Sequence, residues 1–128
     1  MTGPVPLLLD SHALLWWEAD DRRLGAGARE AIEQPAARVF FSAASVWELA
    51  IKQASRKLDV PDSLLATLAE EELTEIAISS AHALLASALP SHHRDPFDRM
   101  LIAQAQSEGL TLVTNDARIA AYDVPLLW

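Results

Sequence analysis

The sequence contains no cysteine, so disulfide bonds and thiolate metal sites are excluded and a reducing compartment is favoured. Long hydrophobic runs are also missing. The stretch MTGPVPLLLD at the N-terminus lacks the features of a signal peptide, and IAISSAHALLASAL (76–89) is shorter than the roughly 20 residues that cross a bilayer. We therefore expect a cytoplasmic protein that makes no use of a membrane.

Positive charge is scarce: ten Lys and Arg residues stand against 18 Asp and Glu residues, which gives a formal net charge of −8. Most proteins that bind nucleic acid carry the opposite sign, because neutralising phosphates supplies much of their affinity. An acidic protein that handles nucleic acid must therefore keep its acids from repelling the substrate. Either several acids converge on divalent cations, which invert the local field, or a basic partner covers them.

The 128 residues correspond to one domain, 1–128, with enough length for a core that needs no disulfide bond. Short apolar runs alternate with helical segments. Strands are expected at 6–10, 38–42, 73–79 and 110–116, with a last strand or tail at 124–128. Helices are expected at 11–19, 25–34, 43–57, 63–72, 80–89, 95–109 and 117–123.

Strands that are apolar almost throughout, alternating with helices, are typical of a parallel sheet covered on both faces. We therefore predict an α/β fold, a three-layer α/β/α sandwich around a mainly parallel central sheet. Such sheets bind ligands at the carboxyl ends of their strands. The polar residues that follow the strands are the first candidates for a functional site.

Two of the helices carry more detailed expectations. Helix 95–109 has Asp95 at its N-cap, Pro96 at its first position and Gly109 at its C-terminal stop. Helix 43–57 has an apolar side that we expect to be buried. The residues of that side are Val46, Leu49, Ala50 and Ala54.

Four acidic residues from distant parts of the chain fall at the expected carboxyl edge. Asp10 ends one strand and Asp116 another, while Glu48 and Asp98 lie early in the helices 43–57 and 95–109. Gathered carboxylates repel one another and lose solvation unless a cation lies between them. Hard, oxygen-binding magnesium or manganese suits such a site better than zinc. A site of this kind can bind a phosphodiester and activate a water.

Each acid also has a simpler explanation. Asp98 and Asp116 could cap helices, and Glu48 could form a surface ion pair with Lys52 worth roughly 0.2–0.5 kcal/mol. Asp10 is hardest to explain in this way, because an acid that ends an apolar strand must be solvated, capped or liganded. The separate explanations weaken when all four acids fall at one edge.

Four stretches in register resemble the PIN-domain ribonucleases, especially the VapC-like toxins of type II toxin–antitoxin pairs. They are LLLDSHALLWW, SAASVWELAIKQASRKLDVP, HHRDPFDRMLIAQA and LTLVTND, and the resemblance runs from about residue 6 to the C-terminus. No single motif is specific, but the four in this order are. The resemblance implies an endoribonuclease that depends on Mg²⁺ or Mn²⁺ and has a parallel-sheet α/β/α fold.

The resemblance also implies roles for individual residues. The catalytic and metal-binding acids of the family fall on Asp10, Glu48, Asp98 and Asp116. The last of these acts more loosely or through water in such proteins. Thr114 and Asn115 match a polar pair that shapes the same corner, while Asp95 recurs in this subgroup with capping as its simplest role. The chain has Ser11 where threonine is frequent and Arg56 where glycine is frequent, and neither change removes a ligand.

The chemistry implied by the family is hydrolysis of RNA by a water that one or two metal ions activate, leaving a 5′-phosphate and a 3′-hydroxyl. The family further implies a homodimer and a cognate antitoxin, whose C-terminal segment wraps the toxin and reaches the acidic pocket with a basic residue. The net charge agrees with a basic partner. Tryptophans 16, 17 and 47 are expected in the core or at an interface.

Several other polar residues are candidates for contacts with substrate. His12 is expected to pack and hydrogen-bond near the site, with a contact to RNA as the alternative. His92 and His93 are expected on a solvated loop that could touch RNA. The basic candidates for contacts with phosphate are Lys52 and Arg99, followed by Arg56, Lys57 and Arg94. For each, a solvated helix end is the alternative.

Three alternatives to a ribonuclease stay open. A PIN-like module could bind RNA or protein without catalysis, and a carboxylate site by itself does not distinguish RNA from DNA. A receiver domain, which accepts a phosphoryl group, would need an acidic pair after the first strand and a lysine after a late one. This chain has one acid there, and its lysines are Lys52 and Lys57.

Overall fold

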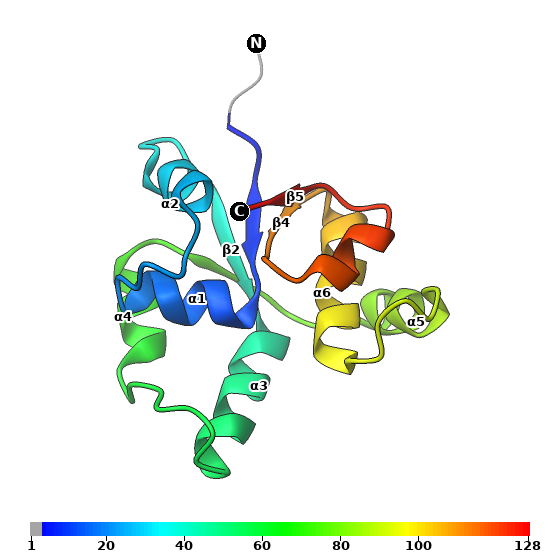
Figure 1. The fold of residues 1–128 in the computed structure, drawn as a ribbon, viewed down its shortest axis with the longest axis horizontal. Helices are drawn as coiled ribbons and strands as arrows, with labels where there is room; N and C mark the ends of the chain where they lie inside the picture. Colours follow the sequence, from blue (N-terminus) through cyan, green and yellow to red (C-terminus); the bar gives the residue numbers. More distant parts are fainter. Residues whose placement is uncertain (1–3) are drawn as a thin grey trace.

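The computed structural model describes residues 4–128, and its centre is a five-stranded sheet (Figure 1). The strand order is β3-β2-β1-β4-β5, and each neighbouring pair is parallel. The strands are β1 (Leu7–Leu9), β2 (Val39–Ser42), β3 (Thr74–Ile76), β4 (Thr111–Val113) and β5 (Leu126–Leu127). All five fall inside the ranges that the sequence predicts.

Helices cover both faces of the sheet, so the predicted α/β/α sandwich is confirmed (Figure 1). The α-helices are α1 (Ser11–Glu18), α2 (Ala26–Glu33), α3 (Ala43–Ala54), α4 (Leu64–Glu70), α5 (Ser80–Ala88) and α6 (Pro96–Glu108), and a 3-10 helix, η1, spans Ala117–Ala121. In Figure 1, α1, α2 and α4 lie on one side of the sheet and α5 and α6 on the other. Among residues 4–128, no helix has both the length and the apolar character to cross a membrane.

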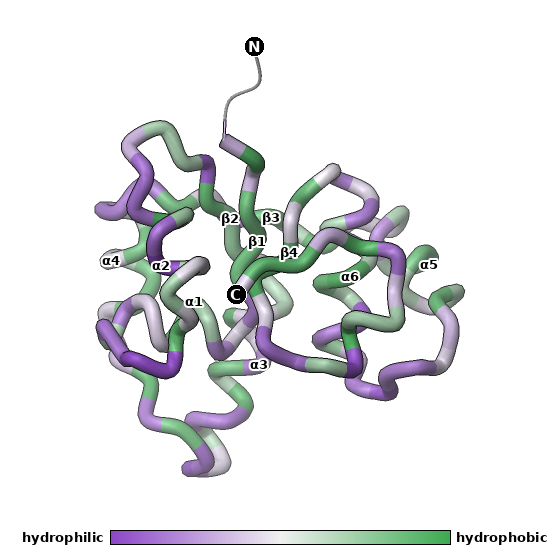
Figure 2. Tube along the Cα trace, turned by 45° about the horizontal axis from the view of Figure 1, so that its top comes forward, coloured by the Kyte–Doolittle hydropathy of each residue, from purple (hydrophilic) through white to green (hydrophobic). Residues whose placement is uncertain are grey.

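The core lies on both faces of β1, because successive side chains of a strand point to opposite sides. Leu7 and Leu9 pack in a cluster with residues of α1, α2 and α4, whereas Leu8 packs with residues of α6 and β4. The tube in Figure 2 shows the apolar residues gathered along the central strands. Because helices cover both faces of the sheet, the side chains at the carboxyl ends of the strands can reach solvent only at that edge.

The local signals at the helix ends are confirmed. Asp95 is the N-cap of α6 and accepts hydrogen bonds from the backbone of Phe97 and Asp98, with Pro96 at the first position. Gly109 ends the helix with φ of 69°, a left-handed conformation that glycine adopts without strain.

The predicted buried side of α3 is wrong in part. Ala50 and Ala54 are exposed, and the polar residues Ser45 and Glu48 are buried instead, together with Leu49. The helix is thus rotated so that a carboxylate points inward at the carboxyl edge of the sheet. A hydrophobic pattern could not predict this orientation, because the buried face contains polar residues.

Candidate active site

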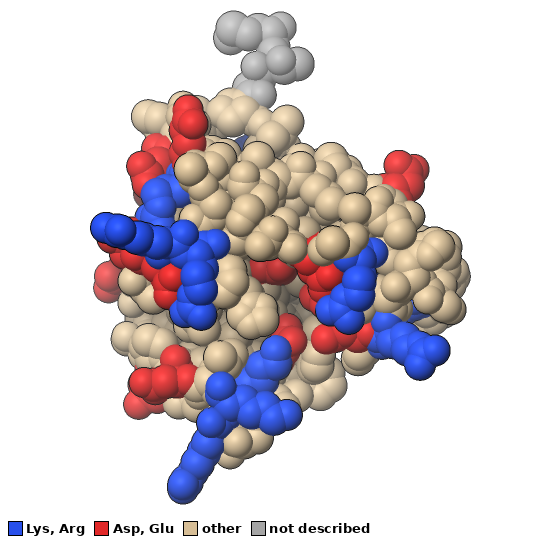
Figure 3. All heavy atoms as spheres, viewed as in Figure 1, with Lys and Arg blue, Asp and Glu red and all other residues tan. Residues whose placement is uncertain are grey.

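A cavity of about 370 Å³ opens at the carboxyl edge of the sheet. The four predicted acids all line it, from four elements: Asp10 at the end of β1, Glu48 in α3, Asp98 in α6 and Asp116 beyond β4. In the view of Figure 3, acidic atoms occupy a central hollow and Lys and Arg atoms stand at its sides. The parallel topology therefore brings together side chains that lie far apart in the sequence.

Asp10 is buried at the start of α1, where it is the N-cap. Its Oδ1 accepts a hydrogen bond of 2.8 Å from the backbone N–H of Ala13, and its carboxylate has a further hydrogen bond to the side chain of Thr114. Burial raises the pKa of Asp10 above its ordinary value, against the effect of these bonds, and the negative charge of Glu48 adds to the rise. Asp10 therefore caps α1 and also lines the cavity.

Glu48 is buried and has a polar partner on each oxygen. Ser11 Oγ donates to Oε1 at 2.5 Å, and Lys52 Nζ lies 2.9 Å from Oε2. The ion pair with Lys52 thus forms, but it lies in the cavity lining and not on a solvated helix surface. Threonine, frequent at the position of Ser11 in the family, has the same hydroxyl group.

Asp98, in the first turn of α6, carries the clearest sign of crowding among the acids. Burial, followed by the charge of Asp95, raises its pKa to about 7, and the charges of Glu48 and Asp10 add to the rise. His93 acts in the opposite direction. Because burial and the neighbouring negative charges disfavour the ionised form of Asp98, a nearby cation would stabilise that form strongly.

Asp116 is the best-satisfied of the four. It is the N-cap of η1, and Arg118 donates to it from its backbone N–H, Nε and Nη2 at 2.9 to 3.1 Å. These bonds, led by those from the arginine side chain, lower the pKa of Asp116 to about 2. Arg118 also lines the cavity, although no sequence motif pointed to it.

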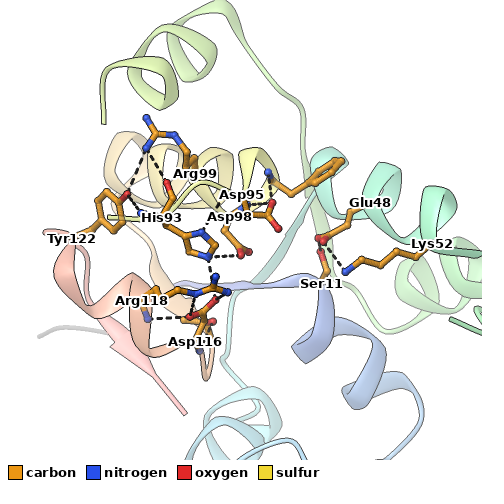
Figure 4. A network of polar contacts seen from close by, with 12 residues as sticks. Ser11, Glu48, Lys52, His93, Asp95, Asp98, Arg99, Asp116, Arg118 and Tyr122 are labelled. Atoms are coloured by element: carbon orange, nitrogen blue, oxygen red, sulfur yellow. Dashed lines mark hydrogen bonds and ion pairs between the residues drawn. The ribbon is translucent and has the colours of Figure 1, made fainter. Parts of the chain in front are cut away.

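His93 is buried, with 2% of its surface exposed, and the expectation of a solvated loop is wrong for this residue. Its Nε2 lies 2.9 Å from Asp98 Oδ2 and 3.1 Å from Asp116 Oδ2 (Figure 4). One sequence feature could have predicted that His93 lies near the acids: it stands two residues before Asp95, the N-cap of the helix that carries Asp98. His92 is exposed, as expected.

The predicted substrate contacts fall into two groups. Lys52, His12 and Asn115 line the cavity, and the His12 ring packs against Trp16, with ring centroids 5.3 Å apart. Thr114 is buried and supports the site from behind, where its Oγ1 accepts from the backbone N–H of Asp116.

Arg99 does not reach the cavity, contrary to the expectation that it would contact phosphate. Its guanidinium donates to the backbone carbonyls of residues 86, 89, 90 and 93 at 2.8 to 3.2 Å. These bonds tie the loop between α5 and α6 to the helix. The guanidinium thus satisfies backbone carbonyls at the end of α5 and in the loop, and it lies away from the acids.

The donor set suits a hard divalent cation. The lining acids supply carboxylate oxygens, and ligand atoms of His93, Asp98 and Asp116 lie within 4.8 Å of one another. The raised pKa of both Asp10 and Asp98 reflects burial and repulsion that a cation would relieve. The residues present therefore fit a metal of the magnesium or manganese type.

An acidic cavity at the carboxyl edge of a parallel sheet places this chain among the α/β proteins that bind their ligands at that edge. A model of the PIN domain matches residues 7–125, and the chain belongs to this family. It is 35% identical to ribonuclease VapC22 of Mycobacterium tuberculosis (strain ATCC 25618 / H37Rv), over 93% of each chain. The resemblance inferred from the four motifs is confirmed.

Two solved structures show the same fold. VapBC2 from Rickettsia felis, bound to a promoter DNA fragment, matches with a TM-score of 0.68 and 15% identity, covering 94% of this chain and 96% of that one. DNA-bound VapBC from Salmonella typhimurium matches with a TM-score of 0.68 and 19% identity, covering 95% and 96%. At these identities the likeness shows the fold alone.

Proposed function

We propose that this protein is a divalent-metal-dependent endoribonuclease and the toxin of a toxin–antitoxin pair. The observation that carries the proposal is the convergence of four carboxylates, from four elements, on one cavity. Support for RNA as the substrate comes from the relative at 35% identity, which is a ribonuclease. Support for a toxin comes from the same relative, because it is a VapC protein and the four motifs of this chain resemble the VapC-like toxins.

In this proposal Asp10, Glu48 and Asp98 hold Mg²⁺ or Mn²⁺, and Asp116 assists. The bound ion supplies activation of a water and stabilisation of the leaving oxygen. Ser11 orients Glu48 through its hydrogen bond to Oε1. RNA hydrolysis leaves a 5′-phosphate and a 3′-hydroxyl.

Two basic side chains of the cavity lining are placed to bind the RNA backbone. Lys52 lies beside Glu48 and Arg118 beside Asp116, at separate acids of the cluster. With a metal held among the acids, Lys52 and Arg118 would be free to pair with phosphate oxygens. The net charge of −8 then ceases to oppose RNA locally, because ion and basic residues dominate the field at the cavity.

The same two ion pairs favour a second candidate, a PIN-like module without catalysis. If Lys52 and Arg118 hold Glu48 and Asp116 more strongly than a metal does, the cavity stays closed to an ion. The Asp116–Arg118 pair is partly exposed, and pairs of that kind are weak, typically 0.2 to about 1 kcal/mol, whereas Glu48 in the other pair is buried. A divalent ion bound by several carboxylates would carry twice the charge of either basic side chain, which favours the enzyme.

We also propose a basic antitoxin and a second copy of the chain as partners. An antitoxin with a basic segment complements the acidic hollow of Figure 3. Trp47 is 62% exposed on α3, beside the exposed Ile51, and its ring packs edge-on against Phe97 of α6 at 5.3 Å. An exposed tryptophan flanked by apolar neighbours is typical of an interface, and we propose that this surface forms a homodimer.

The test of the catalytic proposal is cleavage of RNA by the purified protein with Mn²⁺, with Mg²⁺ and with a chelator. We expect cleavage that requires the metal and is lost in Asp10→Asn and Glu48→Gln. Asp123→Asn removes an exposed acid outside the cavity lining and is expected to cleave like the unchanged protein. Equal cleavage by all variants, or none by the unchanged protein with either metal, would reject the proposal.

A further inference from the structure

His93 lies between the two acids on the η1 side of the cavity and is not assigned a role by the proposed mechanism. It precedes α6, and its side chain is 1% exposed. Nε2 is 2.9 Å from Asp98 Oδ2 and 3.1 Å from Asp116 Oδ2, so a single ring atom contacts both carboxylates (Figure 4). A buried polar group with such partners is held in one orientation.

The hydrogen bonds of the ring fix its tautomer. Nδ1 accepts a hydrogen bond of 3.1 Å from the backbone N–H of Asp95. A proton on Nδ1 would point at this N–H, so the proton of the neutral ring sits on Nε2. His93 therefore donates its N–H to Asp116, and Asp98 Oδ2 lies 2.9 Å from the same nitrogen.

The backbone of His93 is fixed as firmly as its ring. Its N–H donates to Tyr122 Oη at 2.8 Å, and Tyr122 in turn donates to the carbonyl of Pro90 at 2.6 Å. Arg99 Nη1 donates to the carbonyl of His93 at 3.2 Å. The contacts of Arg99 and Tyr122 outside the cavity thus hold the residue that reaches into it.

We propose that His93 is a positioning residue: its Nε2–H bridges Asp98 and Asp116 and holds the two carboxylates at the spacing that the metal requires. This inference deepens the proposed function and rests on it. Asp98 Oδ2 and Asp116 Oδ2 would repel each other without a donor between them, and because Arg118 holds Asp116 through both of its oxygens, Asp98 is the carboxylate that would turn away. The contact at Oδ2 of Asp98 leaves the other oxygen of that carboxylate for the ion.

The rival role for His93 is direct ligation, since its Nε2 and the two carboxylates together resemble a zinc ligand set. Ligation through Nε2 would require the proton to move to Nδ1. The bond from the N–H of Asp95 would then be replaced by two opposed N–H groups. The geometry therefore favours a donor to the ligands over a ligand.

The test compares two substitutions that differ in where they place a donor. His93→Gln can set an amide N–H near the position of Nε2, whereas the shorter His93→Asn sets one near Nδ1 and leaves the carboxylates unbridged. Mn²⁺ affinity is measured by titration calorimetry without RNA, at a temperature where circular dichroism shows each variant folded. We expect His93→Gln to bind close to the unchanged protein and His93→Asn to bind about 10- to 100-fold more weakly.

Two results would overturn the proposal. Unchanged Mn²⁺ affinity in both variants would show that the bridge is dispensable, and equal loss in both, with loss of Zn²⁺ binding, would make His93 a ligand. ¹⁵N NMR of the ring in the metal-free protein provides a readout that needs neither metal nor RNA. A proton on Nε2 supports the bridge and a proton on Nδ1 contradicts it, even if the unchanged protein binds no Mn²⁺ and the proposed function itself fails.

Discussion

Arg118 holds Asp116 through both of its carboxylate oxygens, with Nε 3.1 Å from Oδ1 and Nη2 2.9 Å from Oδ2. The arginine side chain is 67% exposed, whereas the aspartate is largely enclosed. The guanidinium of Arg118 is exposed to solvent while it pairs with Asp116 at the cavity wall. It can therefore exchange the carboxylate for a phosphate of the RNA. Asp116 would then be free to assist the metal as RNA arrives.

Arg118→Ala is therefore expected to weaken RNA binding and to lower the salt dependence of that binding by about one phosphate contact. Binding is measured by fluorescence anisotropy in an Asp10→Asn background, so that the RNA stays intact. Arg38→Ala removes an exposed arginine at the opposite end of β2 and serves as the control. The same salt dependence in both variants would assign Arg118 a purely capping role.

Arg99→Ala is expected to destabilise the fold by about 2 to 3 kcal/mol, because several carbonyls lose a charged donor. Urea unfolding measures the change. Arg94→Ala, an exposed arginine in the adjoining loop, is the matched control and should stay within about 0.5 kcal/mol of the unchanged protein. If Arg99→Ala leaves stability intact and reduces cleavage, Arg99 contacts the substrate after all.

The stability of the metal-free protein should fall as pH rises from about 4 to about 7. Asp98, with its pKa raised to about 7, stays protonated in the folded state while the unfolded chain ionises near 3.8, so its contribution is present at low pH and lost across this window. Saturating Mn²⁺ should remove much of this fall in stability. Thermal unfolding at a series of pH values, with and without Mn²⁺, measures the stability.

Glu18 must be separated from Asp98 in that experiment. Burial and a hydrogen bond with Glu71 raise the pKa of Glu18 to about 7 as well, so it acts in the same direction over the same window. Asp98→Asn and Glu18→Gln should each flatten part of the pH dependence, but only Asp98→Asn should alter the effect of Mn²⁺. A decline that neither variant changes would contradict both assignments.

Trp47→Asp is expected to convert the proposed homodimer to a monomer, because a charge at a buried interface replaces a large aromatic contact worth about 2 kcal/mol or more. Sedimentation velocity measures the state. Leu65→Asp changes another exposed apolar residue, on α4, and is expected to leave the dimer intact. If the unchanged protein sediments as a monomer, the proposed dimer is wrong. If both variants sediment as monomers, the surface around Trp47 is not the specific site of the dimer.

The sequence predicted the fold well where local chemistry and packing agree. Helix α6 could be bounded from Asp95, Pro96 and Gly109 alone, because capping and glycine geometry act within one turn. The edge where the acids meet followed from parallel strands and their order along the chain. Both inferences use rules that hold without knowledge of distant contacts.

Burial that depends on distant contacts could not be predicted. Glu48 is buried because its site lies at the carboxyl edge, against the apolar pattern of α3. His93 is buried because Tyr122, 29 residues away, receives its N–H. Arg56 has φ of 59°, a left-handed conformation that explains why glycine is frequent there in the family, yet nothing in its neighbours indicated it.

The most direct measurement of the central proposal is the anomalous diffraction of Mn²⁺ in crystals of the unchanged protein and of Asp10→Asn. The account predicts a peak in the cavity among Asp10, Glu48 and Asp98 in the unchanged protein, and its loss in the variant. No peak at millimolar Mn²⁺, with Lys52 still paired to Glu48 as it is here, would contradict it.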